Sequence, residues 1–108
     1  MKHIFLRLAL VRAGLPEPEL NVPIIDEGGR RHHEPDLSYR KYRIGIEYEG
    51  EHHSEDGQVV RDIDRSGRYA ALGWTEVRIS RRHMFNDAKP AVTKVRSALV
   101  QAGWRKGD

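Results

Sequence analysis

The chain has 108 residues, which is enough for one domain built around one hydrophobic core. It contains no cysteine, so a disulfide framework, a zinc–thiolate cluster and a cysteine nucleophile are excluded. Hydrophobic residues make up 38% of the chain and charged residues 32%, with a formal net charge of +3 at pH 7. This balance is typical of a soluble globular domain and not of a disordered segment.

The longest apolar run near the start of the chain extends from Ile4 to Val11, and Arg7 interrupts it. The run is far too short to span a bilayer, and no small-residue cleavage site follows it. Together with the absence of cysteine, this predicts an intracellular, cytoplasmic protein with no membrane partner.

The first predicted element is a helix over residues 3–13, where apolar residues recur at helical spacing and Gly14 and Pro16 end the pattern. The residues of this pattern are Ile4, Phe5, Leu8 and Val11. A short strand is predicted over residues 21–25, with Val22, Ile24 and Ile25 turned inward. A turn at residues 27–29 leads to a second strand, from residue 30 or 31 to about Tyr39.

The clearest strand of the sequence covers residues 43–49. Its apolar residues Ile44, Ile46 and Tyr48 alternate with Gly45, Glu47 and Glu49. One face of the strand is therefore apolar, and the other face carries two carboxylates. The residues from 50 to 56 are predicted to form a polar loop.

Three further elements follow the loop. A helix is predicted over residues 57–72, a strand over 74–80 and a last helix over 87–102, with Gly73 and Gly103 as helix ends and Pro90 in the first turn of the last helix. The residues expected to face inward are Val59, Ile63, Gly67 and Ala70 in the 57–72 helix, Trp74, Val77 and Ile79 in the strand, and Val92, Val95, Leu99 and Ala102 in the last helix. Arg61, Arg65 and Arg68 are expected on the opposite side of the 57–72 helix.

This order of elements predicts an α/β fold in which helices flank a central mixed sheet of about four strands. The strands on either side of the 57–72 helix are joined by a crossover connection, so we expect them to be a parallel pair.

Two carboxylates eleven residues apart fall on neighbouring strands of this predicted sheet. If a hairpin pairs Tyr39 with Ile44, Asp36 lies opposite Glu47, with Cβ atoms roughly 5 Å apart. Glu49 lies on the same face, two residues further on. Crowded carboxylates repel each other, and Mg²⁺, which takes oxygen ligands, resolves that repulsion. The alternative is that Glu47 and Glu49 face solvent on a sheet covered on one side only.

Several motifs accompany these carboxylates: Pro35-Asp36, Glu47-Tyr48-Glu49-Gly50-Glu51-His52-His53, Arg61-Asp62 with Arg65, and Leu72-Gly73-Trp74 with Arg78. As a set they resemble the PD-(D/E)xK nuclease superfamily and, more narrowly, the small domains related to very-short-patch-repair endonucleases. The resemblance covers roughly residues 9–100 and includes the GLPEPELNVPI segment, which is similar to actinobacterial members. It implies a restriction-endonuclease-like three-layer fold, Mg²⁺ or Mn²⁺ as cofactor, and DNA as partner.

The resemblance also implies roles for single residues. Asp36 corresponds to the metal-binding aspartate and Glu47 to the second acidic position. Glu49 stands where many members of the superfamily carry a lysine, which suggests that it binds metal or acts as a base. His53 resembles the histidine that protonates the leaving oxygen or holds a metal-bound water. His52 is the second candidate, since adjacent loop residues point in different directions.

One position departs from the pattern. Relatives carry a glutamate near the start of the first helix, whereas this chain has none before Glu17, and His3 occupies the approximate place. The departure implies a lost N-terminal part, a differently built site or an impaired enzyme. The alternative function is therefore a nuclease-fold module that binds nucleic acid or a partner, or a toxin-like domain of a toxin–antitoxin or defence system.

Arginines dominate the charge between residues 61 and 82, with six arginines against three acidic residues. A guanidinium group binds phosphate in a planar, bidentate way, so we expect some of these side chains to contact nucleic acid. The predicted contacts are Arg61, Arg65, Arg81 and Arg82. For Arg65 and Arg68 a structural ion pair is the alternative, and Arg65 could also orient a carboxylate of the site.

Two other chemistries are disfavoured. His32, His33, His52 and His53 match no zinc-binding spacing, and adjacent histidines on a strand face opposite ways. No serine lies in a Gly-x-Ser-x-Gly elbow. The sequence therefore predicts a Mg²⁺-dependent endonuclease of DNA repair or defence, with DNA favoured over RNA as the substrate and no organic cofactor. We expect it to act as a monomer or weak dimer, as one domain over residues 1–108 or as the C-terminal part of a longer protein.

Overall fold

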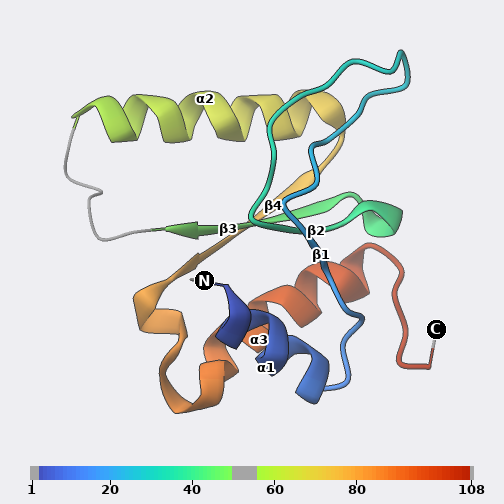
Figure 1. Ribbon diagram of the computed structural model, residues 1–108, viewed down its shortest axis with the longest axis vertical. Helices are drawn as coiled ribbons and strands as arrows, with labels where there is room; N and C mark the ends of the chain where they lie inside the picture. The colour runs from blue at the N-terminus through green and yellow to red at the C-terminus, as the bar shows by residue number, and fades with distance from the viewer. Residues whose placement is uncertain (1–2, 50–55, 108) are drawn as a thin grey trace.

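The computed structural model of the chain describes residues 3–49 and 56–107, and for residues 56–62 it describes the backbone alone. The elements in chain order are α1 (Ile4–Arg12), β1 (Glu19–Leu20), β2 (Leu37–Tyr39), the 3-10 turn η1 (Arg40–Tyr42), β3 (Ile44–Glu49), α2 (Asp56–Leu72), β4 (Thr75–Ser80), the 3-10 turn η2 (Arg81–His83) and α3 (Phe85–Gln101). Figure 1 shows these elements coloured along the chain.

The four strands form one mixed sheet in the order β1-β2-β3-β4. The first three strands are antiparallel neighbours, and β4 is parallel to β3 because α2 carries the chain back across the sheet. The predicted α/β class, the parallel pair and the hairpin register, in which Tyr39 pairs with Ile44, are all confirmed.

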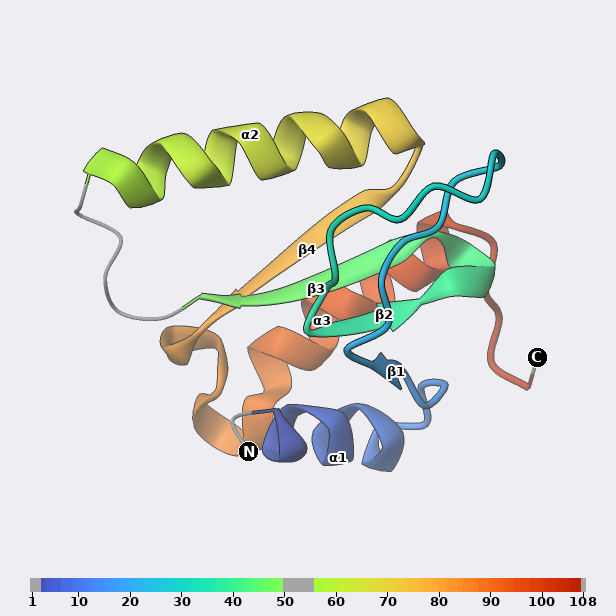
Figure 2. The same cartoon turned by 45° about the horizontal axis from the view of Figure 1, so that its top comes forward.

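The helices lie on both faces of the sheet. In Figures 1 and 2, α2 covers one face, and α1 and α3 lie side by side under the other. The hydrophobic core fills the space between the sheet and the α1–α3 pair. Its fully buried members include Leu6, Leu10, Leu37, Ile44, Ile46, Ile79, Val95 and Leu99. None of the helices in the described part of the chain is long and apolar enough to cross a bilayer.

The buried side of α1 is not the one that its most regular apolar spacing predicted. Leu6 and Leu10 face the core, whereas Leu8 is half-exposed and Phe5 is 74% exposed. Ile4 and Val11 are also exposed. Apolar residues occur around most of α1, so contacts with α3 and the sheet decide which side is buried, and periodicity alone does not.

The predicted buried stripe of α2 is also wrong where the side chains are described. Ile63 is 65% exposed, and Gly67 and Ala70 are exposed too. Tyr69 is buried instead. The side chain of Arg65, which forms an ion pair with Glu76, is only 17% exposed. The reason is the sheet face beneath the helix, which is polar and therefore selects the polar side of α2.

Smaller corrections concern the element ends. The first strand is Glu19–Leu20, so residues 21–25 contribute only the bridge from Ile25 to Arg31, and β2 is limited to Leu37–Tyr39. At the other end of the chain Ala102 is exposed, and Trp104 is buried in the core in its place. The chain turns back after α3, where the Trp104 amide donates to the Leu99 carbonyl at 2.9 Å.

Candidate active site

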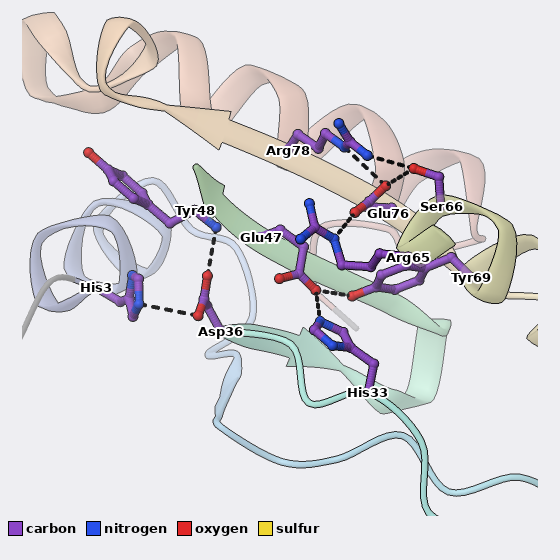
Figure 3. Close-up of polar contacts among 10 residues, drawn as sticks. All are labelled: His3, His33, Asp36, Glu47, Tyr48, Arg65, Ser66, Tyr69, Glu76 and Arg78. Atoms are coloured by element: carbon purple, nitrogen blue, oxygen red, sulfur yellow. Dashed lines mark hydrogen bonds and ion pairs between the residues drawn. The ribbon is translucent and has the colours of Figure 1, made fainter. Parts of the chain in front are cut away.

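The polar face of β3 and β4, under α2, holds the charged groups that the sequence singled out. Alternation in β3 turns Ile44 and Ile46 toward the core and Glu47 toward α2. In β4 the same alternation turns Glu76 and Arg78 toward α2. Figure 3 shows these side chains together with Asp36, which directly precedes β2.

Asp36 is attached to β3 beside Glu47. Leu37 pairs with Ile46, so Asp36, one residue earlier, falls opposite Glu47, one residue later. The Asp36 Oδ2 atom accepts a hydrogen bond from the Tyr48 amide at 2.7 Å. The backbone carbonyl of Asp36 accepts another from the Asn21 amide at 3.2 Å. Asp36 and Glu47 therefore lie next to each other on adjacent segments at one end of the β2–β3 hairpin.

His3 contacts Asp36 from the start of α1. Its Nε2 atom is 3.4 Å from Asp36 Oδ1, and its ring is tilted against that of Tyr48 at 5.7 Å between centroids. Its Nδ1 atom is buried and has no hydrogen-bond partner among the described residues. The histidine thus stands beside the first carboxylate, where the resemblance placed the missing glutamate.

Glu47 is 6% exposed, which is rare for a carboxylate. Its Oε2 atom accepts a hydrogen bond from the Tyr69 hydroxyl at 2.5 Å and lies 2.6 Å from His33 Nε2. Burial raises the pKa of Glu47 above its ordinary value, although Tyr69 and His33 act in the opposite direction. Burial, and then the contact with Glu47, raise the pKa of Tyr69 far above its ordinary value, so its hydroxyl stays protonated and donates.

Tyr69 reaches Glu47 across Gly45. A Cβ atom on Gly45 would lie only 2.2 Å from the Tyr69 hydroxyl oxygen and 2.6 Å from a ring carbon. A glycine inside a strand often marks the close approach of another group, and here that group is an aromatic ring.

Glu49 belongs to a second cluster, between β4 and α2. Its Oε1 atom is 3.3 Å from a guanidinium nitrogen of Arg78. Glu76, at the centre of this cluster, accepts hydrogen bonds from Arg65 at 2.7 Å, Ser66 at 2.9 Å and Arg78 at 3.1 Å. Burial acts to raise the pKa of Glu76, but these three donors outweigh it and hold that pKa below its ordinary value.

The structure thus separates the three carboxylates predicted to bind one metal ion. Asp36 and Glu47 share one end of the β2–β3 hairpin, whereas Glu49 is paired with Arg78. Among the described residues, no group of three or more histidine, aspartate or glutamate side chains is arranged to hold a metal ion. Mg²⁺ takes oxygen ligands and commonly binds through one or two carboxylates with several waters, so Asp36 and Glu47 carry donor atoms of the kind that this ion requires.

The remaining predicted residues fall into three groups. His52 and His53 lie outside the described residues, as does the side chain of Arg61. Arg65 forms the structural ion pair with Glu76 that was one of its alternatives. Arg81 and Arg82 are exposed in η2, directly after Ser80, which is paired with Glu49. These two arginines therefore follow the same end of the sheet that carries the carboxylates.

Sequence reasoning missed two partners of Glu47. Tyr69 was not considered, although Gly45 inside a buried strand was a signal that a bulky group approaches the backbone there. His33 was weighed only as a member of a transition-metal site. In the structure the adjacent histidines diverge, and His32 contacts Asp26 at 2.8 Å while His33 contacts Glu47.

With the fold established as α/β, comparison with known proteins adds two relatives. Two uncharacterised proteins from two strains of Mycobacterium tuberculosis are each 38% identical to this chain over 74 residues. The match covers 68% of this chain but 27% of either relative, so the chain spans little more than a quarter of the length of the curated relatives it matches. No protein-family model and no solved structure matches the sequence.

Proposed function

We propose that this domain is a metal-dependent endonuclease that hydrolyses phosphodiester bonds, in DNA rather than RNA. The proposal depends on one observation, the placement of Asp36 beside the buried Glu47 on adjacent segments at one end of the β2–β3 hairpin. An apolar residue in place of Glu47 would avoid the cost of burying a carboxylate. Retaining the acid at this position is typical of a functional site.

In this proposal Asp36 and Glu47 hold Mg²⁺ or Mn²⁺. When bound there, such an ion would supply Lewis acidity toward water and the phosphoryl group. Tyr48 and His3 orient Asp36, and Tyr69 and His33 orient Glu47. His53 is proposed to protonate the leaving oxygen. Glu49 serves as a base for the attacking water, held in place by Arg78.

Arg81 and Arg82 are proposed to bind the phosphates that flank the scissile bond. Both are exposed, and both follow the end of β4 that lies beside the end of β3. A guanidinium group binds a phosphate of the nucleic-acid backbone in a planar, bidentate way.

A second candidate function is a nuclease-fold module that binds nucleic acid without cleaving it. It is favoured by the partners of the carboxylates, since Glu49 is paired with Arg78 and Glu47 contacts His33. In this case the ion pairs are structural, and the arginines alone provide the function.

Plasmid nicking distinguishes the two functions. The chain and the variants Asp36→Asn and Glu47→Gln are incubated with supercoiled plasmid in Mg²⁺, Mn²⁺ or EDTA. Glu17→Gln is the matched control, since Glu17 is an exposed carboxylate whose ion pair is with Arg7 and not with a residue of the proposed site. We expect metal-dependent nicking by the native chain and the control, and a loss of at least about 100-fold in both site variants.

Nicking that survives both site substitutions would show that another site or a contaminant is responsible. Absence of nicking, with plasmid binding that weakens steeply as salt increases, would favour the binding module.

A further inference from the structure

Tyr69 is an unusual residue for its place in the fold. It is 2% exposed and is the one fully buried side chain among residues 63–72 of α2. It does not belong to the apolar core, which lies on the other face of the sheet. Its burial therefore needs an explanation other than hydrophobic packing against α1 and α3.

The space for Tyr69 is provided by Gly45. The φ angle of Gly45 is not positive, so the backbone conformation at this position does not require glycine. What requires glycine is the distance, because even a methyl group would collide with the tyrosine ring and hydroxyl. Gly45 and Tyr69 are thus a matched pair, in which one residue lacks a side chain so that the other can reach Glu47.

The contact defines the orientation of Glu47. Both of the contacts described for this carboxylate, from Tyr69 and from His33, fall on Oε2. Figure 3 shows the other carboxylate oxygen of Glu47 turned toward the side on which Asp36 lies. A free glutamate samples several rotamers, and ordering it costs free energy whenever it binds a ligand. A hydroxyl fixed by the fold removes much of that cost in advance.

We infer that Tyr69 is a positioning residue of the proposed metal site, where its hydroxyl holds Glu47 so that one carboxylate oxygen faces Asp36 and the metal ion. This inference rests on the proposed function. The hydroxyl is a neutral donor, so it orients the carboxylate and leaves its negative charge in place. An arginine in the same position would neutralise that charge. Tyr69 itself does not touch the metal ion or the substrate.

The test compares Tyr69→Phe with Tyr39→Phe. Tyr39 is the matched control because it is also a buried tyrosine with one hydroxyl hydrogen bond, to the Pro16 carbonyl at 2.8 Å, away from Glu47. For each variant one measures the Mg²⁺ concentration for half-maximal nicking, the rate at saturating Mg²⁺, the Kd of Mn²⁺ by calorimetry and the melting temperature.

We expect Tyr69→Phe to raise the Mg²⁺ requirement and the Mn²⁺ Kd by about 10- to 100-fold, with much of the rate recovered at saturating metal. Tyr39→Phe should leave both metal quantities unchanged. A merely structural role of Tyr69 would lower the melting temperature of the variant without this selective effect on metal.

The double variant Gly45→Ala with Tyr69→Leu gives a second measurement that does not depend on Tyr69→Phe folding. The smaller leucine relieves the collision with the new methyl group, and the hydroxyl is again absent. We expect the same increase in Mg²⁺ requirement. A native requirement in either folded variant would overturn the positioning role alone, whereas a native chain that neither binds Mn²⁺ nor nicks plasmid would overturn the proposed function, and the inference with it.

Discussion

At the scale of single residues, Glu47 shows a conflict between folding and the proposed chemistry. Its carboxylate is buried on a polar sheet face, and burial raises its pKa above the ordinary value of 4.5. For an acid with a raised pKa, the stabilising contribution is fully present below the unfolded-state value and is lost as pH rises through the folded-state value. Above the folded-state pKa the ionised Glu47 therefore counts against folding.

This sign gives a prediction for stability. Glu47→Gln should raise the urea midpoint of unfolding at pH 7, because the amide avoids the burial of a charge, and the gain should shrink as the pH falls through the folded-state pKa of Glu47 and be lost below about 4.5. Urea titrations of both proteins at pH 7 and pH 4 provide the measurement. A lower midpoint for the variant at pH 7 would mean that the contacts with His33 and Tyr69 outweigh the burial of the charge.

The candidate site could be predicted from the sequence as far as its carboxylates. Asp36 and Glu47 were found because a hairpin register relates residues on two strands by counting, and that register is confirmed. Tyr69 and His33 come from segments whose approach to Glu47 depends on how α2 and the 21–36 segment pack on the sheet, and sequence spacing contains no information on that packing.

At the scale of elements, the three helices were predicted in place, but the buried sides predicted for α1 and α2 were wrong. Periodicity locates a helix, but it identifies the buried side only if one side is distinctly apolar. α1 has apolar residues on most sides, and α2 covers a polar sheet face. A hydrophobic pattern therefore cannot identify the buried side of either helix. The last helix has one clear apolar stripe, and Val92, Val95 and Leu99 are buried as predicted.

Alanine substitutions in α1 test which side is buried. Leu6→Ala should lower the free energy of unfolding by about 2–5 kcal/mol, because it leaves a cavity in the core. Leu8→Ala removes a half-exposed side chain from the same helix, so it should change that free energy by less than about 1 kcal/mol. Chemical denaturation of the two variants provides the comparison, and equal losses would show that α1 is rotated relative to the core described above.

At the scale of the whole molecule, the charges proposed to bind nucleic acid lie at one end of the sheet. Figures 1 and 2 show the C-terminal end of β4, where Arg81 and Arg82 follow, on the opposite side from the C-terminus of the chain. Each phosphate contact releases condensed counterions, so binding should weaken with salt in proportion to the number of contacts.

We expect DNA binding to depend on the arginines at the C-terminal end of β4 and not on positive charge elsewhere in the chain. Arg82→Ala should weaken the binding of the chain to duplex DNA and reduce the slope of log K against log salt concentration by about 1. Lys106→Ala, near the C-terminus, removes the same charge at the far end and should leave the slope unchanged. Fluorescence anisotropy over a salt series gives both slopes. Equal effects of the two substitutions would indicate attraction to net charge and no defined contact surface.

The polar layer beneath α2 has a thermal consequence. The core between the sheet and the α1–α3 pair buries apolar surface, and exposing such surface raises the heat capacity. The described side chains of α2 contact the sheet through ion pairs and hydrogen bonds, as from Arg65 and Ser66 to Glu76, and exposing polar surface has the opposite sign. Cooling therefore weakens the apolar attraction that holds α1 and α3 to the sheet more than it weakens the polar contacts of α2.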